Sequence, residues 1–211
     1  EPLEAGRLAD ELWVKNADDL WTRLGTRAMF RYGHDRWKDS QGEAAARKQG
    51  MDLVAKYGGR VLREFQDDPN GLEQAGSLAY HAAVATLQLW QGTQDAERGR
   101  AALFLFEKLL VAKPRNASFL RGTAVLAEKL DGPDRAMECW RKLVAGLPPQ
   151  SDGWFEARFH LIRLLATADP ARAREVMNQH KQLIPEYGPD PWGPQLKGLD
   201  EILPKEPITP M

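Results

Sequence analysis

The amino-acid sequence predicts an all-α protein in which helix–turn–helix hairpins follow one another along the chain. Val, Ile and Thr are sparse, and no alternation of apolar and polar residues lasts long enough for a strand. Ala, Leu, Arg and Glu, which favour helices, dominate instead. In addition, the segment FEKLLVAKPRN at 106–116 returns in related form 34 residues later, within CWRKLVAGLPPQ at 139–150. A spacing of that length fits one helical hairpin per repeat.

Eight long helices are predicted in order, and the first spans residues 6–32. Its apolar positions share one face: Leu8, Leu12, Trp13, Ala17, Leu20, Trp21, Leu24 and Ala28. The second, 43–66, has its own apolar face: Met51, Val54, Tyr57, Val61, Leu62 and Phe65. Within it, Gly58-Gly59 predicts a kink or a close helix contact. Six further helices are predicted at 72–91, 96–112, 117–130, 133–146, 152–167 and 170–183.

Start and stop residues delimit the later helices. Gly132-Pro133 and Asp169-Pro170 each place a capping residue before a proline at the first helical position. Asn116 and Asp152 are predicted to cap the two helices between them. Prolines then close the alternate helices, at Pro114, Pro148 and Pro185.

Three landmarks recur together in the second helix of three successive hairpins. The small residues are Ala102, Ala136 and Ala173, and four residues later come Phe106, Trp140 and Met177. Pro114, Pro148 and Pro185 each follow twelve residues after the alanine. Alanine allows two helices to approach closely, the large side chain fills the space to the next unit, and proline ends the helix.

Over about 77–185 this pattern resembles the tetratricopeptide repeat (TPR) family. The resemblance implies a right-handed α-solenoid with three repeats at 71–185, preceded by an N-terminal hairpin at 1–70 that is a degenerate repeat or a cap. A capping helix and tail at 186–211 would follow, with Leu196, Leu199 and Leu203 on one side of the helix. The family's small residue in the first helix is present as Ala124, but Val84 and Leu161 occupy the matching places. A plain helical bundle is the alternative.

The resemblance also implies a partner-binding groove, because the first helix of each family repeat lines a concave wall. On this chain the wall residues would be His81, Gln88, Arg121, Val125, Glu128, Phe155, Arg158 and Ile162. Such a wall suits an extended or helical peptide with apolar anchors and an acidic group opposite the arginines. The alternative is that Arg121 and Arg158 pair with Glu128, Glu156 or solvent.

The tryptophans differ in the burial that their surroundings in the sequence predict. Trp13, Trp21 and Trp140 lie on predicted apolar faces and are expected in the core. Trp37 lies in the polar segment RYGHDRWKDSQG. It is either an exposed interface anchor or a side chain folded back over its own hairpin.

Composition and motifs exclude several function classes. Hydrophobic residues make up 43% and charged residues 28% of the chain, with a net charge of −1, so a folded protein is expected. Arginines are interleaved with acids, which argues against nucleic acid as a partner. Phosphate-binding glycine loops, HExxH and paired-cysteine motifs are absent, and the single cysteine, Cys139, is expected to be buried. His160 and His180 lack the further ligands of a metal site, so neither catalysis nor a cofactor is predicted.

Three functions remain from the sequence. The first is a non-catalytic scaffold that binds a peptide or protein segment in the concave groove. The second is a structural or assembly subunit that binds through its N-terminal hairpin, convex face or tail. The third is an RNA-binding helical repeat, which the charge balance disfavours. No apolar run approaches a membrane span, and the Glu-Pro start favours an exported bacterial protein after signal removal over a cytoplasmic one.

Overall fold

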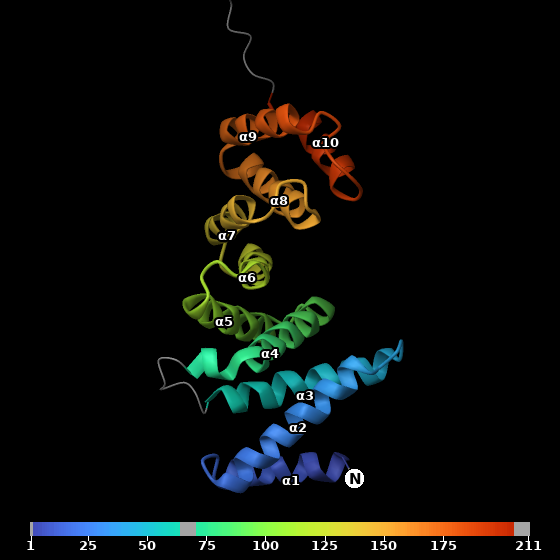
Figure 1. The fold of residues 1–211 in the computed structure, drawn as a ribbon, viewed down its shortest axis with the longest axis vertical. Coiled ribbons are helices and arrows are strands. Elements are labelled where there is room, and N and C mark those ends of the chain that lie inside the picture. Colours follow the sequence, from blue (N-terminus) through green and yellow to red (C-terminus); the bar gives the residue numbers. More distant parts are fainter. Residues whose placement is uncertain (1, 64–70, 205–211) are drawn as a thin grey trace, which may run out of the picture. The chain divides into compact units, whose positions relative to one another are not determined.

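The structure, a computed structural model, describes residues 2–63 and 71–204, with side chains at 4–63 and 77–204 (Figure 1). These residues form ten α-helices and no strand, so the predicted all-α class is confirmed. They divide into two compact units, Glu1–Pro114 and Arg115–Met211. The end of the predicted second helix, with Phe65, and the tail at 205–211 lie outside the described residues.

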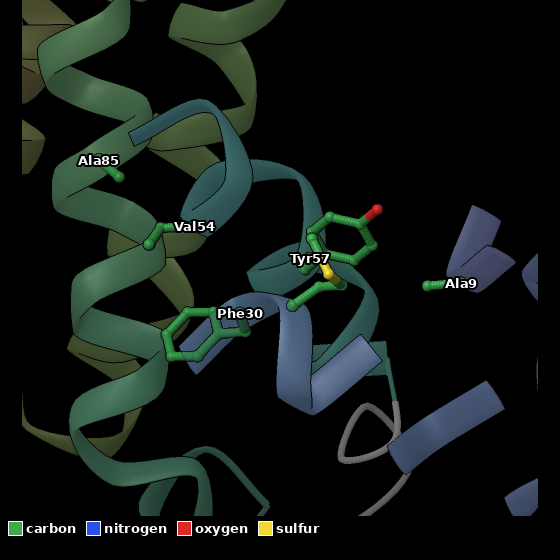
Figure 2. Packing of buried hydrophobic residues seen from close by; sticks show 6 residues of the cluster. Ala9, Phe30, Val54, Tyr57 and Ala85 are labelled. Carbon is green, nitrogen blue, oxygen red and sulfur yellow. The ribbon is translucent and has the colours of Figure 1, made fainter. Parts of the chain in front are cut away.

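The N-terminal unit has five helices, each packed against the next one along the chain. They are α1 (Pro2–Lys15), α2 (Leu20–Lys38), α3 (Ala44–Arg63), α4 (Gly71–Thr93) and α5 (Ala96–Ala112). Figure 2 shows part of their core, in which Phe30 of α2 and Val54 and Tyr57 of α3 lie between Ala9 of α1 and Ala85 of α4. The Tyr57 hydroxyl lies 3.1 Å from the Gly6 carbonyl oxygen, which ties α3 to α1.

Glycines set the distance between the middle helices of this unit. A Cβ atom on Gly33 of α2 would lie 2.5 Å from the Leu53 Cβ, and one on Gly50 of α3 would lie 2.5 Å from the Trp37 backbone nitrogen. A Cβ on Gly58 would similarly meet the Ala82 Cβ of α4 at 2.6 Å. Real Cβ atoms do not approach so closely, and therefore these glycines allow α2, α3 and α4 to pack with their backbones in near contact. The close contact predicted at Gly58 is confirmed.

The predicted single helix at 6–32 is wrong, because the chain turns at residues 16–19 and divides it into α1 and α2. Asp19 begins the second helix, and its carboxylate accepts hydrogen bonds from the Trp21 and Thr22 backbone N–H groups at 2.9 and 3.4 Å. An aspartate at this position satisfies backbone donors that would otherwise lack a partner. The acidic pair Asp18-Asp19 in the middle of the apolar pattern is therefore a helix start.

This break changes which side chains of α2 are buried. The helix packs on α3 through Met29, Phe30 and Gly33, and the residues one and two turns earlier on the same face are Thr22 and Thr26, both buried. Leu20, Trp21 and Leu24 lie on the opposite side and are exposed to 63, 69 and 47%. The predicted burial of Trp21 is therefore wrong, whereas Trp13 is half-buried.

The C-terminal unit has the other five helices. They are α6 (Ala117–Leu130), α7 (Pro133–Gly146), α8 (Asp152–Ala168), α9 (Pro170–Leu183) and α10 (Trp192–Ile202). Each of the first three packs on its successor, and α10 packs on α8. The predicted boundaries of this region are confirmed to within a residue. Asn116 caps α6 as expected, but the cap of α8 is Ser151 rather than Asp152, since the Ser151 hydroxyl accepts the Trp154 N–H at 3.3 Å.

The repeated landmarks have matching positions in their own helices. Ala102, Ala136 and Ala173 are fully buried, and so are the large residues Phe106, Trp140 and Met177. Each closing proline lies two residues beyond the last residue of its helix, since α5, α7 and α9 end at Ala112, Gly146 and Leu183. The predicted burial of Trp140 and of Cys139 is confirmed.

The last helix covers one side of α8. Leu196, Leu199 and Leu203 are buried, as their spacing predicted. Asp200 accepts hydrogen bonds from Lys181 Nζ at 2.8 Å and from the Tyr187 hydroxyl at 2.7 Å, and it pairs with Arg174. The ion pairs of Asp200 therefore hold α10 to α9, in addition to its packing on α8.

Candidate functional site

The residues predicted to line a groove belong to two units of the chain. His81 and Gln88 lie on α4 of the N-terminal unit, and both are half-buried. The other six lie on α6 and α8 of the C-terminal unit.

Arg121 on α6 is exposed and engaged in an ion pair. Its Nε and Nη2 atoms donate hydrogen bonds of 2.7 Å to the two carboxylate oxygens of Glu156 on α8. This is the pairing that the sequence offered as the alternative to a partner contact. The Arg121 side chain keeps 53% of its surface exposed, whereas the Glu156 side chain keeps 12%. A partner carboxylate could therefore approach the guanidinium from the solvent side.

Arg158 on α8 is buried, with 7% of its surface exposed. Its Nη2 donates to the Val176 carbonyl oxygen at 3.0 Å, and the guanidinium lies 4.9 Å from the centre of the Trp154 ring. Burial lowers the pKa of Arg158. In this structure its charge faces the interior of the unit, not a surface that a partner can reach.

Phe155 and Ile162 of the same helix are also buried. The segment before α10 covers Phe155 so tightly that a Cβ on Gly188 would lie 2.3 Å from the aromatic ring. Together with Arg158, these residues form core contacts of α8. They are not accessible to a peptide in this structure.

Glu128 at the end of α6 is the centre of a polar cluster. Its Oε1 accepts a 2.9 Å hydrogen bond from Trp140 Nε1 and lies 3.1 Å from His160 Nδ1, and Arg163 pairs with the other oxygen. Burial alone would raise the pKa of Glu128, but these hydrogen bonds, first that of His160, lower it to about 2. The side chain is 9% exposed. Glu128 therefore joins α6, α7 and α8 rather than facing a partner.

His81 in the N-terminal unit forms an aromatic cluster with residues of α2. The His34 and His81 ring centroids are 4.5 Å apart, and the Trp37 ring lies nearly perpendicular to both, with centroid distances of 6.4 and 6.5 Å. Burial, then His34 and Lys38, lower the pKa of His81. Trp37 is half-buried and folded against its own hairpin. This is the second of the two arrangements considered for it.

The most exposed group of large apolar side chains in the N-terminal hairpin is one that the sequence placed in the core. Leu20, Trp21 and Leu24 project from the first two turns of α2, and Leu8 and Val14 of α1 are exposed as well. Large side chains exposed together on a folded protein mark an interaction surface more often than single ones do. The helix start at Asp18-Asp19, followed by Met29 and Phe30 on a different face from Leu20 and Leu24, was the signal that could have revealed this arrangement.

The described residues do not suggest a reactive centre. Among them there is no group of three His, Cys, Asp or Glu side chains that could hold a metal ion, and no helix is both long and apolar enough to span a membrane. His160 stacks on Trp140 and His180 stacks on Trp154, so each imidazole has a packing role.

Comparison of the chain with protein-family models, with curated proteins and with solved structures finds no match. The arrangement of its own side chains is therefore the basis for a functional proposal.

Proposed function

We propose that this protein is a non-catalytic scaffold for protein–protein interaction, built from helical hairpins that stack as a right-handed solenoid similar to that of the TPR family. Three features support the repeat. The landmark alanines are buried at matching positions, a large buried residue follows each after one turn, and each proline lies at the same distance beyond its helix. Three such coincidences are not expected of a plain helical bundle. Hairpins of this kind bury their apolar sides only by packing on neighbours.

The observation that carries the functional part is the exposure of Leu20, Trp21 and Leu24 on α2. The described residues of the N-terminal unit leave these side chains exposed. Trp and Arg are enriched at interface hot spots, and Trp21 lies on the same helix as Arg23 and Arg27. We therefore infer binding through the N-terminal hairpin, as a subunit of a larger protein assembly.

Peptide binding in a concave groove is the second candidate. In the C-terminal unit it is supported by the exposure of Arg121 and the partial exposure of Val125. In the N-terminal unit, His81 and Gln88 are partly exposed. An acidic group of the peptide would recruit Arg121 from Glu156. Phe155, Arg158 and Ile162 contribute nothing to this mode while they are buried.

Site-specific photo-crosslinking in the native source tests the proposal. A photo-reactive residue is placed at position 21, at position 121, and at the control position Leu183, which is apolar and exposed on α9. A protein crosslinked from position 21 supports the hairpin, and one crosslinked from position 121 supports the groove. If both positions recover only what Leu183 recovers, the scaffold proposal is overturned.

A further inference from the structure

The exposed face of α2 changes from apolar to basic along the helix. Leu20, Leu24, Arg27 and Arg31 are spaced by four, three and four residues, which places them in one line on a helix. All four are exposed, and Trp21 lies beside the first two. We call these five residues the Leu20–Arg31 face. It lies opposite the buried side that Thr22, Thr26 and Met29 form against the rest of the unit.

The charge of this helix has one sign over most of its length. Between Asp19 and Asp35 the sequence contains three arginines, at positions 23, 27 and 31, and no acidic residue. Asp19 is used as the cap of α2, and Asp18 lies 3.8 Å from Arg23. The face therefore presents apolar groups at its start and positive charge at its end. A complementary partner carries apolar groups followed by carboxylates.

Two other occupants fit this face less well. A second copy of the chain would bring Arg27 and Arg31 of each α2 together, with no carboxylate from residues 20–34 of either copy. An anionic membrane would have to accept the turn between Val14 and Leu20, which contains Asp18 and Asp19. Two aspartates there would face the negative headgroups and oppose insertion.

We propose that the Leu20–Arg31 face binds an acidic amphipathic helix of a partner protein. The apolar side chains of that helix would contact Leu20, Trp21 and Leu24, and its carboxylates would lie opposite Arg27 and Arg31. This inference rests on the proposed scaffold function and specifies the chemistry of its partner. A helix of three to four turns that runs parallel to α2 is long enough, because the face covers residues 20–31 of α2 at 1.5 Å per residue. Its recognition pattern is leucine at i and i+4, with glutamate at i+7 and i+11.

Fluorescence polarisation with a designed, dye-labelled peptide tests the proposal on the full chain. The acidic peptide carries leucines and glutamates in that pattern, and a basic peptide has lysine in place of each glutamate. We expect the wild-type chain to bind the acidic peptide at least about tenfold more tightly than the basic one. Trp21→Ser combined with Leu24→Ser should weaken the acidic peptide by about tenfold or more. The matched control is Leu183→Ser, at an exposed leucine outside the face, and it should leave binding unchanged.

Charge reversal makes the test specific. Arg27→Glu combined with Arg31→Glu should abolish the preference for the acidic peptide and transfer it to the basic peptide. Lys129→Glu combined with Arg141→Glu, at exposed positions of the C-terminal unit, is the control with the same change in net charge. Circular dichroism confirms that each variant is folded, which is expected because all the substituted side chains are exposed.

The outcomes separate this inference from the scaffold proposal. Equal binding of both peptides, or binding that survives the Trp21 and Leu24 substitutions, overturns the acidic-helix inference. Two further results would also overturn it. One is dimerisation that depends on Trp21, measured by sedimentation velocity, and the other is Trp21-dependent retention on phosphatidylserine vesicles. If photo-crosslinking from position 21 still recovers a protein, the scaffold stands and only the chemistry assigned to its partner is wrong.

Discussion

The imidazole ring of His160 lies parallel to the indole ring of Trp140, with the ring centroids 4.6 Å apart and the planes inclined by 9°. Both rings direct a nitrogen toward the same carboxylate oxygen of Glu128, at 3.1 and 2.9 Å. One acidic side chain thus connects α6 to the two helices that follow it. Because Trp140 is also the large landmark residue of its hairpin, the carboxylate orients the residue that fills the space between neighbouring helices.

Replacing this carboxylate should cost measurable stability. Glu128→Gln keeps the size of the side chain but removes the charge that accepts from Trp140 and pairs with Arg163. We expect the free energy of unfolding to fall by about 1–3 kcal/mol at pH 7, since hydrogen bonds to charged groups contribute that much. Urea unfolding measures the change. Glu138→Gln is the control, because Glu138 is half-exposed and its ion pairs among the described residues are with Arg135 and Lys142 of its own helix. A loss there as large as that of Glu128→Gln would contradict the special role of Glu128.

The lowered pKa of Glu128 predicts how the free energy of unfolding depends on pH. Folding lowers the pKa of Glu128 from 4.5 to about 2, so the unfolded chain binds the proton first as the pH falls. The stabilisation is complete above pH 4.5 and is lost as the pH approaches 2. It is on the order of 3 kcal/mol at its largest. The difference in unfolding free energy between wild type and Glu128→Gln should therefore shrink across this interval, and a difference that stays constant from pH 5 to pH 2.5 would exclude the effect.

His81 predicts a second pH dependence at higher pH. Burial, followed by the nearby His34 and Lys38, lowers the pKa of His81 below 6.5 in the folded chain. Asp35 lies 3.6 Å from His34 and is the acidic group beside the pair. Because the unfolded chain binds the proton more readily, stability is complete above pH 6.5 and falls as the pH decreases below that value.

The measurement compares wild type with His81→Gln. Thermal unfolding at pH 7.5 and pH 5.5 should show a larger loss for wild type than for the variant, since glutamine does not titrate. A variant that loses as much stability as wild type would show that other groups cause the dependence.

The contact between α2 and α3 predicts opposite effects for two glycines of the same helix. In Gly50→Ala the added Cβ would lie 2.5 Å from the Trp37 backbone nitrogen, so we expect destabilisation of about 2 kcal/mol or more. In Gly59→Ala the Cβ would meet nothing within 4 Å, and the better helix propensity of alanine should stabilise the protein by up to about 1 kcal/mol. Denaturant midpoints of the two variants provide the comparison. The close packing of α2 on α3 would be refuted by a stabilising Gly50→Ala.

The attachment of α10 predicts a local effect in the C-terminal unit. Asp200→Ala removes the acceptor shared by Lys181, Tyr187 and Arg174. We expect faster amide hydrogen exchange throughout residues 192–202, with little change in α6 or α7, because the lost contacts join α10 to its neighbours. Glu201→Ala, at an exposed residue of the same helix, is the control. Unchanged exchange in α10 would mean that its buried leucines hold it alone.

The sequence predicted the helices between residues 96 and 183 almost to the residue, because their boundaries depend on local chemistry. A capping side chain such as that of Asn116 acts within one turn, and a proline two residues after a helix prevents its continuation wherever the helix packs. The landmark alanine and the large residue of each hairpin can also be recognised locally, since they lie one helical turn apart in the sequence. The first helix was mispredicted for a related reason: Asp19 caps α2, but the helical spacing of Trp13, Ala17 and Leu20 continues across the turn and concealed it.

The candidate sites depended on contacts between helices that are distant in the sequence, and for them the pattern was a poor guide. Nothing near Arg158 in the sequence indicates that Val176 accepts its hydrogen bond or that the segment around Gly188 covers Phe155. Glu128 has the spacing of a wall residue, yet side chains of α7 and α8 enclose it. Whether a polar side chain faces a partner or the core is decided by what packs over it.

By itself, then, the sequence determined that the chain is helical, where most helices begin and end, and which alanines allow close packing, because these properties arise within one or two helical turns. Only the tertiary structure decided which side of α2 is covered. Met29 and Gly33 bring that helix against α3. Since a helix is rigid, fixing one end in this way also buries Thr22 and turns Trp21 toward solvent.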